Sequence, residues 1–231
     1  MEGKYFNLLK RDTQELVFEI ESTIKKEIQV EVKASDRDIL ACNVDDGFPK
    51  IILPRSAYFP DSSVIHELIH IKRFLVEKVP LLTVSEDFLN KSLEQGFLAI
   101  DNDLEHLHVI KAEVVMRPER HEYWVGVFDQ SMDRIDQSTL AQSDKDGALV
   151  RLFLLSEIAI LNKNLSDKAR DLIQSPAIHN SLDQFLVDIK SHLSSKQRIS
   201  ELLINFLDLK KYYPCLEYMD EHGDFVQKKL F

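Results

Sequence analysis

The segment "PKIILPRSAYFPDSSVIHELIHIKRFL", residues 49–75, decides how this chain begins to fold. Its first part is short and rich in β-branched residues, which predicts a strand at about 49–54. "SAYFPDSS" is typical of a turn, and Asp61 or Ser62 is a suitable N-cap for a helix that runs to about Lys78. The segment therefore predicts a strand, a turn and a long helix in direct succession.

The residues before this segment predict one helix and two further strands. Residues 13–27 repeat apolar side chains at helical spacing. Two short runs rich in β-branched residues follow at about 28–34 and 38–44, and the polar sequences "SDRD" and "DDGF" that bound them are typical of turns. With the strand at 49–54, the chain has three predicted strands before its central helix.

The residues after the segment are predicted to be mostly helical. "TVSE" at 83–86 has the spacing of a capping box, and the helical region that it opens continues to about Met116. "RPERHEYWVGVF" indicates a turn and a short extended segment, and the polar residues 129–146 indicate a linker. "LVRLFLLSEIAIL" is expected to form a buried helix, with a partner interface as the alternative. We therefore expect an α+β core over residues 1–128 and a helical C-terminal subdomain over residues 129–231, packed on that core.

Composition and charge limit the class of protein. The chain has 231 residues, of which 44% are hydrophobic and 29% charged, as in ordinary soluble globular proteins. Its net charge of −10 argues against nucleic-acid binding, because phosphate contacts need a basic surface. The N-terminus has no apolar stretch typical of a secretory signal, and no window approaches the ~18 apolar residues of a membrane span. Cys42 and Cys215 have no CxxC spacing, which excludes a disulfide scaffold and a zinc ribbon. We expect a cytoplasmic protein with no nucleic-acid or membrane partner, and its oligomeric state is left open.

His66, Glu67 and His70 are candidates for metal-dependent catalysis. Residues four apart lie on the same face of a helix, so both imidazoles could bind one Zn²⁺ ion. Glu67 lies one step round the helix, where it could take a proton from a metal-bound water and pass it to a leaving amine. This is the chemistry of H-E-x-x-H in metalloproteases. The alternative is a hydrogen-bonded core cluster without a metal, but burying these groups without partners would cost on the order of several kcal/mol.

"HELIH" at 66–70 resembles the active-site helix of the zincin superfamily of zinc metallopeptidases. Its uncharged flanks agree with that family, whereas Lys72 stands where the longer motif usually has an apolar residue. The resemblance implies a zinc cofactor, a peptide or protein substrate, and an active-site helix that follows a small sheet. By the same analogy, "PKIILPR" would be the edge strand along which a substrate backbone lies. The chain lacks the glutamate-alanine-asparagine stretch of the metallopeptidases that cleave phage repressors, so no subfamily is assigned.

A catalytic zinc ion needs a third protein ligand. The metzincin continuation, with a glycine and a third histidine soon after the motif, is absent, which leaves the gluzincin pattern of a glutamate on the following helix. We predict Glu105, because it shares a helix face with Asp101 and His108 and thus repeats the polar face of the first helix. The alternatives for this ligand are Glu94, His106 and His108. Side chains that could orient a ligand by hydrogen bonding are Asp101, Asn102 and His106.

The remaining catalytic role is stabilisation of the oxyanion. Gluzincins usually supply a tyrosine, histidine or arginine for it. The candidates after the predicted ligand helix are Arg117, Arg120, His121 and Tyr123. We predict Tyr123 and His121. The expected function is zinc-dependent hydrolysis of peptide bonds, and the alternative is a catalytically inactive zincin-like or purely structural protein-interaction module.

Overall fold

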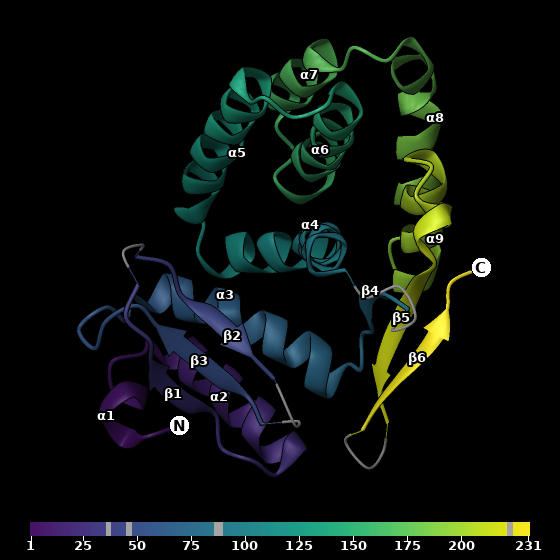
Figure 1. Ribbon diagram of the computed structural model, residues 1–231. Coiled ribbons are helices and arrows are strands. Elements are labelled where there is room, and N and C mark those ends of the chain that lie inside the picture. The colour runs from purple at the N-terminus through teal and green to yellow at the C-terminus, as the bar shows by residue number, and fades with distance from the viewer. Residues whose placement is uncertain (36–37, 45–47, 86–89, 221–223) are drawn as a thin grey trace. The chain divides into compact units, whose positions relative to one another are not determined.

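The computed structural model describes residues 1–35, 38–44, 48–85, 90–220 and 224–231 (Figure 1). The chain folds into two compact units. The first unit comprises Met1–Val79 with Tyr218–Val226, and the second comprises Pro80–Glu217 with Gln227–Phe231. Helices and two small three-stranded sheets make the fold mixed α+β, as the sequence predicted.

The first unit contains most of the elements expected around residues 49–75. In chain order they are α1 (Gly3–Phe6), α2 (Arg11–Ile24), β1 (Gln29–Val32), β2 (Ala41–Asn43), β3 (Lys50–Leu53) and α3 (Asp61–Ile71), which continues as a π-helical turn, η2 (Lys72–Val76). The helix predicted at 13–27, the three strands and the helix from Asp61 are therefore confirmed, with ends within a few residues of those expected. Lys78 adopts a left-handed conformation at φ 57°, and the helical path ends before it.

The sheet of the first unit has the order β1-β3-β2. β3 is parallel to β1 and antiparallel to β2, with Ile51 opposite Val30 on one side and opposite Cys42 on the other. The expectation that "PKIILPR" forms an edge strand is wrong, because β3 lies between the other two strands. β1 and β2 form the edges of this sheet (Figure 1).

One face of this sheet is covered by helices. Ile51 and Leu53 are fully buried, whereas the alternate residues Lys50 and Ile52 are half-buried. Because side chains alternate across a strand, the first pair points towards the helical layer. α2 packs against α3, and α3 packs against β2. The core of the unit therefore lies between the sheet and these two helices, and it fixes the orientation of α3.

The second unit contains a long helix followed by a helical array. Its elements are β4 (Leu81–Val84), α4 (Lys91–Met116), α5 (Arg120–Gln137), α6 (Gln142–Leu154), the π-helical turn η4 (Leu155–Ala159), α7 (Lys163–Leu172), α8 (Pro176–Ser191), α9 (Lys196–Phe206) and the 3₁₀ turn η5 (Lys210–Tyr212). The strands β5 (Pro214–Met219) and β6 (Phe225–Lys229) each have residues in both units. α4 packs against β4, α6 and η4, and α6 also packs against α5 and α7. β4 and β5 pair antiparallel, in a sheet ordered β4-β5-β6.

Three sequence predictions for this region are wrong. Thr83 lies in strand β4, opposite Cys215, and not in a capping box, while Glu86 lies outside the described residues. The expected extended segment and linker are helical, since α5 and α6 occupy most of residues 120–154. The expected division into a core of residues 1–128 and a helical subdomain of residues 129–231 stays a prediction. The C-terminal strands β5 and β6 were not predicted.

Among the described parts of the chain, no helix combines the length and the apolar character that crossing a membrane requires.

Candidate metal and catalytic site

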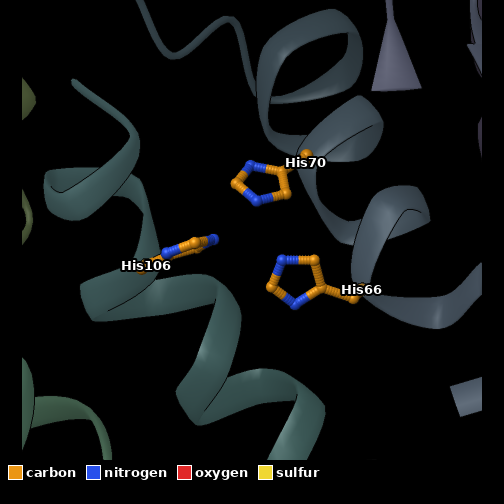
Figure 2. Close-up of side chains that lie close together, drawn as sticks. All are labelled: His66, His70 and His106. Atoms are coloured by element: carbon orange, nitrogen blue, oxygen red, sulfur yellow. The ribbon is translucent and has the colours of Figure 1, made fainter. Parts of the chain in front are cut away.

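α3 carries the two predicted histidine ligands on consecutive turns. The ring centroids of His66 and His70 lie 4.9 Å apart, and the ring planes are inclined at 70°. His66 is 7% exposed, and His70 is half-buried. Figure 2 shows the two rings along one side of α3, drawn together with His106 of α4. The predicted helical spacing of this pair is thus confirmed.

The apolar residues of α3 hold this helix in the core. Val64, Ile65, Leu68 and Ile71 are fully buried. These side chains occupy the positions between and beside the two histidines, so α3 cannot rotate about its axis without exposing them to water. The helix therefore presents His66 and His70 from a rigid element, and not from a loop.

Glu67 acts on a residue of the sheet. It is 9% exposed, and it influences the pKa of the Cys42 thiol in β2. Burial raises the pKa of this thiol well above its usual value, and the negative charge and hydrogen bond of Glu67 raise that pKa further. Cys42 therefore stays protonated. The sequence offered only a weak signal for this interaction, since Cys42 is one residue of a three-residue strand.

Glu105, the predicted third ligand, forms an ion pair within the second unit. Its Oε1 lies 2.8 Å from Nζ of Lys196, the first residue of α9. The same Nζ lies 2.7 Å from Oδ1 of Asp101, which also accepts a hydrogen bond of 2.7 Å from the backbone N–H of Leu82. All three charged side chains are less than 10% exposed. Glu105 and Asp101 thus hold α4, α9 and β4 together, and the role of Glu105 as a metal ligand stays a prediction.

Burial and charge act in opposite directions on Asp101. Burial raises the pKa of its carboxyl group, and the positive charge and hydrogen bond of Lys196 lower it, with burial the larger effect. The negative charge of nearby Glu105 also raises the pKa of Asp101. Two carboxylates share one ammonium group here, so the cluster depends on Lys196 for its stability.

His106, an alternative ligand, has neighbours that restrict its ring. Asn102 Nδ2 lies 3.4 Å from His106 Nδ1, and the ring of Trp124 packs against the imidazole at a centroid distance of 5.5 Å. Trp124 is itself fixed, because its Nε1 donates a hydrogen bond of 2.8 Å to the fully buried carboxylate of Glu113, which also pairs with Arg120. The carboxylate of Glu113 is thus already paired with Trp124 and Arg120. The ring of His106 is half-buried, with Trp124 against one face.

The predicted oxyanion residues lie on α5. Tyr123 is 49% exposed, and the guanidinium of Arg120 lies 3.7 Å from the centroid of its ring. His121 is half-buried, with Nε2 lying 3.1 Å from the carbonyl oxygen of Ile160 and Nδ1 lying 3.1 Å from Glu122. Both side chains have local partners in the second unit, and their catalytic roles stay predictions.

The donor chemistry of α3 fits a zinc ion. Two neutral imidazoles one turn apart are typical zinc ligands, and Zn²⁺ prefers nitrogen and sulfur donors in tetrahedral sites. This arrangement can bind a divalent ion and accept a proton.

A scan against protein-family models, a search of curated proteins and a search of solved structures found no match. The resemblance to the zincins rests on residues 64–71.

Proposed function

We propose that this protein is a zinc-dependent peptidase. The observation that carries the proposal is the arrangement on α3, where His66 and His70 lie on consecutive turns of a buried helix with the carboxylate of Glu67 beside them. Three ionisable groups in an apolar helix reduce stability unless they are paired or bind a metal. A peptide or protein is the proposed substrate, and a cytoplasmic location the proposed setting.

We propose His106 as the third ligand, in preference to Glu105. Glu105 is neutralised by Lys196 at 2.8 Å, and a metal would compete with that ammonium group for the same oxygen. His106 would supply from α4 a third imidazole to add to those that His66 and His70 supply from α3. Three histidines with an open fourth position are a known form of catalytic zinc site. With its amide turned so that the oxygen faces the ring, Asn102 would accept a hydrogen bond from His106 Nδ1–H, which would leave Nε2 free for the metal.

Each residue has a defined role in the proposed reaction. When bound, zinc would supply a Lewis acid that polarises the scissile carbonyl and makes a coordinated water more acidic. Glu67 would accept the proton of the attacking water and deliver it to the leaving amine. Tyr123 and His121 remain the proposed donors to the oxyanion.

Replacement of Glu67 by glutamine tests the function. Glu67→Gln keeps the size of the side chain but removes its basicity, so hydrolysis of denatured casein should fall about 100-fold or more while zinc content is unchanged. Glu77→Gln is the matched control, because Glu77 follows the same helix, is 43% exposed in its side chain and pairs with Arg73 at 3.5 Å, away from the histidines. This control should retain wild-type activity. Full activity in Glu67→Gln would refute the proposed base, and absence of hydrolysis in the zinc-loaded wild type would favour an interaction module.

The third ligand is tested separately. His106→Ala should weaken zinc binding by about 10-fold or more, whereas Glu105→Gln should leave zinc affinity near that of the wild type. The zinc dissociation constant of each variant can be measured by competition with a chromogenic chelator. Weaker zinc binding in Glu105→Gln than in His106→Ala would indicate that Glu105 is the third ligand.

A further inference from the structure

Trp124 of α5 packs against two residues on one face of α4. His106 and Glu113 are seven residues apart, about two helical turns, so their side chains lie along the same face of that helix. The indole ring lies against the imidazole of His106, with a centroid distance of 5.5 Å and an angle of 55° between the planes. Its Nε1 donates a hydrogen bond of 2.8 Å to Oε2 of Glu113. Trp124 therefore connects these two residues within the second unit.

The indole ring is held in place on several sides. Trp124 is 9% exposed, and Glu113, which accepts its N–H, is fully buried and also pairs with Arg120. The ring of Phe128, one turn further along α5, packs on the indole at a centroid distance of 5.8 Å. If the indole turned away, the buried carboxylate would lose a donor, at a cost of about 1–3 kcal/mol. The indole is therefore a fixed surface for His106 to pack on.

The indole is the stronger of two constraints on the His106 ring. The torsion that turns an imidazole about its Cβ–Cγ bond has broad minima, so neighbours must hold the ring in one orientation. The side-chain amide of Asn102 lies 3.4 Å from Nδ1, beyond the usual hydrogen-bond range of about 2.7–3.2 Å, and this contact is exposed to solvent. An aromatic pair in a tilted arrangement contributes about 0.5–1.5 kcal/mol beyond the area that it buries. Because the indole covers one face of the imidazole, it also limits how far that ring can rotate.

We propose that Trp124 is a positioning residue that holds the His106 imidazole in the orientation in which its Nε2 binds the metal. The inference rests on the proposed function only in that His106 is a zinc ligand. A metal ligand must be held within about 10–20° of its productive orientation, and neighbours that are themselves locked by packing achieve this best. The indole suits this role because its packing on the face of the imidazole uses neither ring nitrogen.

Fluorescence of the wild type tests whether a bound metal lies next to Trp124, which is the sole tryptophan of the chain. Sites with imidazole ligands also bind Co²⁺, and the partly filled d shell of this ion quenches a nearby excited indole. One equivalent of Co²⁺ should therefore quench most of the emission of the metal-free protein, and prior addition of zinc should prevent the quenching. His106→Ala should need a higher Co²⁺ concentration for the same quenching. Unchanged emission in a wild type that has bound Co²⁺ would overturn the inference.

Zinc affinity, measured by competition with a chromogenic chelator, tests the positioning role. Trp124→Ala should weaken zinc binding about 10-fold, as expected for loss of a residue that orients a ligand. Trp124→Phe keeps an aromatic ring against His106 and should retain most of the affinity, although it loses the hydrogen bond to Glu113. Equal affinity in Trp124→Ala and the wild type, or equal losses in the alanine and phenylalanine variants, would overturn the role.

A second buried residue of α5 provides the matched control. Met132 is fully buried on the same face of α5, about two turns beyond Trp124. Met132→Ala should therefore lose stability but keep wild-type zinc affinity, and a loss of affinity equal to that of Trp124→Ala would overturn the role. If circular dichroism shows that Trp124→Ala is unfolded, Trp124→Leu takes its place, because leucine fills more of the space without supplying a ring.

These measurements separate the inference from the proposed function. If the wild type binds zinc but hydrolyses no peptide, the proposed activity fails, and the zinc affinities of the Trp124 variants still decide the positioning role. If the wild type is an active zinc enzyme and Trp124→Ala retains its affinity, the proposed function stands and the positioning role fails. If the wild type binds neither zinc nor Co²⁺, both fail.

Discussion

Replacement of Lys196 by methionine should strongly destabilise the second unit. Lys196→Met keeps most of the unbranched side chain and removes only the ammonium group, so the variant isolates the effect of charge. Asp101 and Glu105 would then be left buried without their shared cation. The lysine makes contacts of 2.7 and 2.8 Å with the two carboxylates, and each hydrogen bond to a charged group is worth about 1.5–3 kcal/mol. Breaking a buried ion pair by removing one partner typically costs about 3–5 kcal/mol, and we expect a loss in this range.

The loss should depend on pH in a defined direction. Burial raises the pKa of Asp101 in the folded chain above its ordinary value, which is the value in the unfolded chain. Between these two pKa values the folded chain therefore binds more protons than the unfolded chain. Stability from this group is therefore present at low pH and is lost as the pH rises through the folded pKa. Without Lys196 the pKa of Asp101 should rise further, so the loss in Lys196→Met should be large at neutral pH. It should shrink as the pH falls towards about 4, where the unfolded carboxyl also binds its proton.

The assay is urea unfolding followed by fluorescence. Trp124 is the sole tryptophan of the chain and lies in the same unit as Lys196. Lys190→Met is the control, since Lys190 is 43% exposed in its side chain and pairs with Glu157 at 3.2 Å, so the expected loss is below about 1 kcal/mol. Adding Glu105→Gln to Lys196→Met should recover part of the stability, because one buried charge is removed. A loss below about 1 kcal/mol for Lys196→Met at neutral pH would refute the buried cluster.

Three further variants test other parts of the fold. Leu68→Ala empties a fully buried position on α3 and should lower the free energy of unfolding by about 2–5 kcal/mol in calorimetry, so a change within error would argue against this core. Asn162 is the N-cap of α7, and its side chain accepts a hydrogen bond of 3.1 Å from the Leu165 N–H. Asn162→Ala should lower the free energy of unfolding in urea by about 0.5–2 kcal/mol, and an unchanged midpoint would contradict this role. Trp124→Phe leaves the buried carboxylate of Glu113 without one donor and should cost about 1–3 kcal/mol by circular dichroism, whereas wild-type stability would contradict the network.

The first unit was predictable because its signals are local. The apolar spacing of residues 13–27, the β-branched runs and the turn residues each determine an element without reference to distant parts of the chain. The position of β3 in the centre of the sheet was not predictable in this way. It depends on the parallel pairing with β1, and the sequence of a three-residue or four-residue strand does not specify its neighbours.

The second unit was harder to predict because its signals are weak or non-local. β4 pairs with β5 near the end of the chain, and the spacing of Thr83 and Glu86 imitates a capping box. α5 was missed because its buried face is narrow, consisting of Trp124, Phe128 and Met132 at four-residue steps among polar residues. Those steps are a helical signal that a search for isolated four-residue spacing would have found.

In the candidate site too, local features could be predicted from the sequence, whereas contacts between distant elements could not. The face shared by His66 and His70 follows from helical geometry and was predicted correctly. The interactions of Glu67 and Glu105 could not be predicted, because Cys42 and Lys196 come from distant elements and neither has a distinctive sequence context. The sequence pointed to Glu105 by its polar surroundings, and those same surroundings are explained by its pairing with Lys196.

The proposed activity requires that α3 binds zinc through its two histidines. Zinc binding can be measured by elemental analysis of the protein, purified without chelator and then supplied with a small excess of zinc and desalted. We predict close to one zinc ion per chain in the wild type and almost none in His66→Ala/His70→Ala, with both proteins folded by circular dichroism. A wild type that retains no zinc, or a double variant that retains as much as the wild type, would show that the two histidines do not bind zinc.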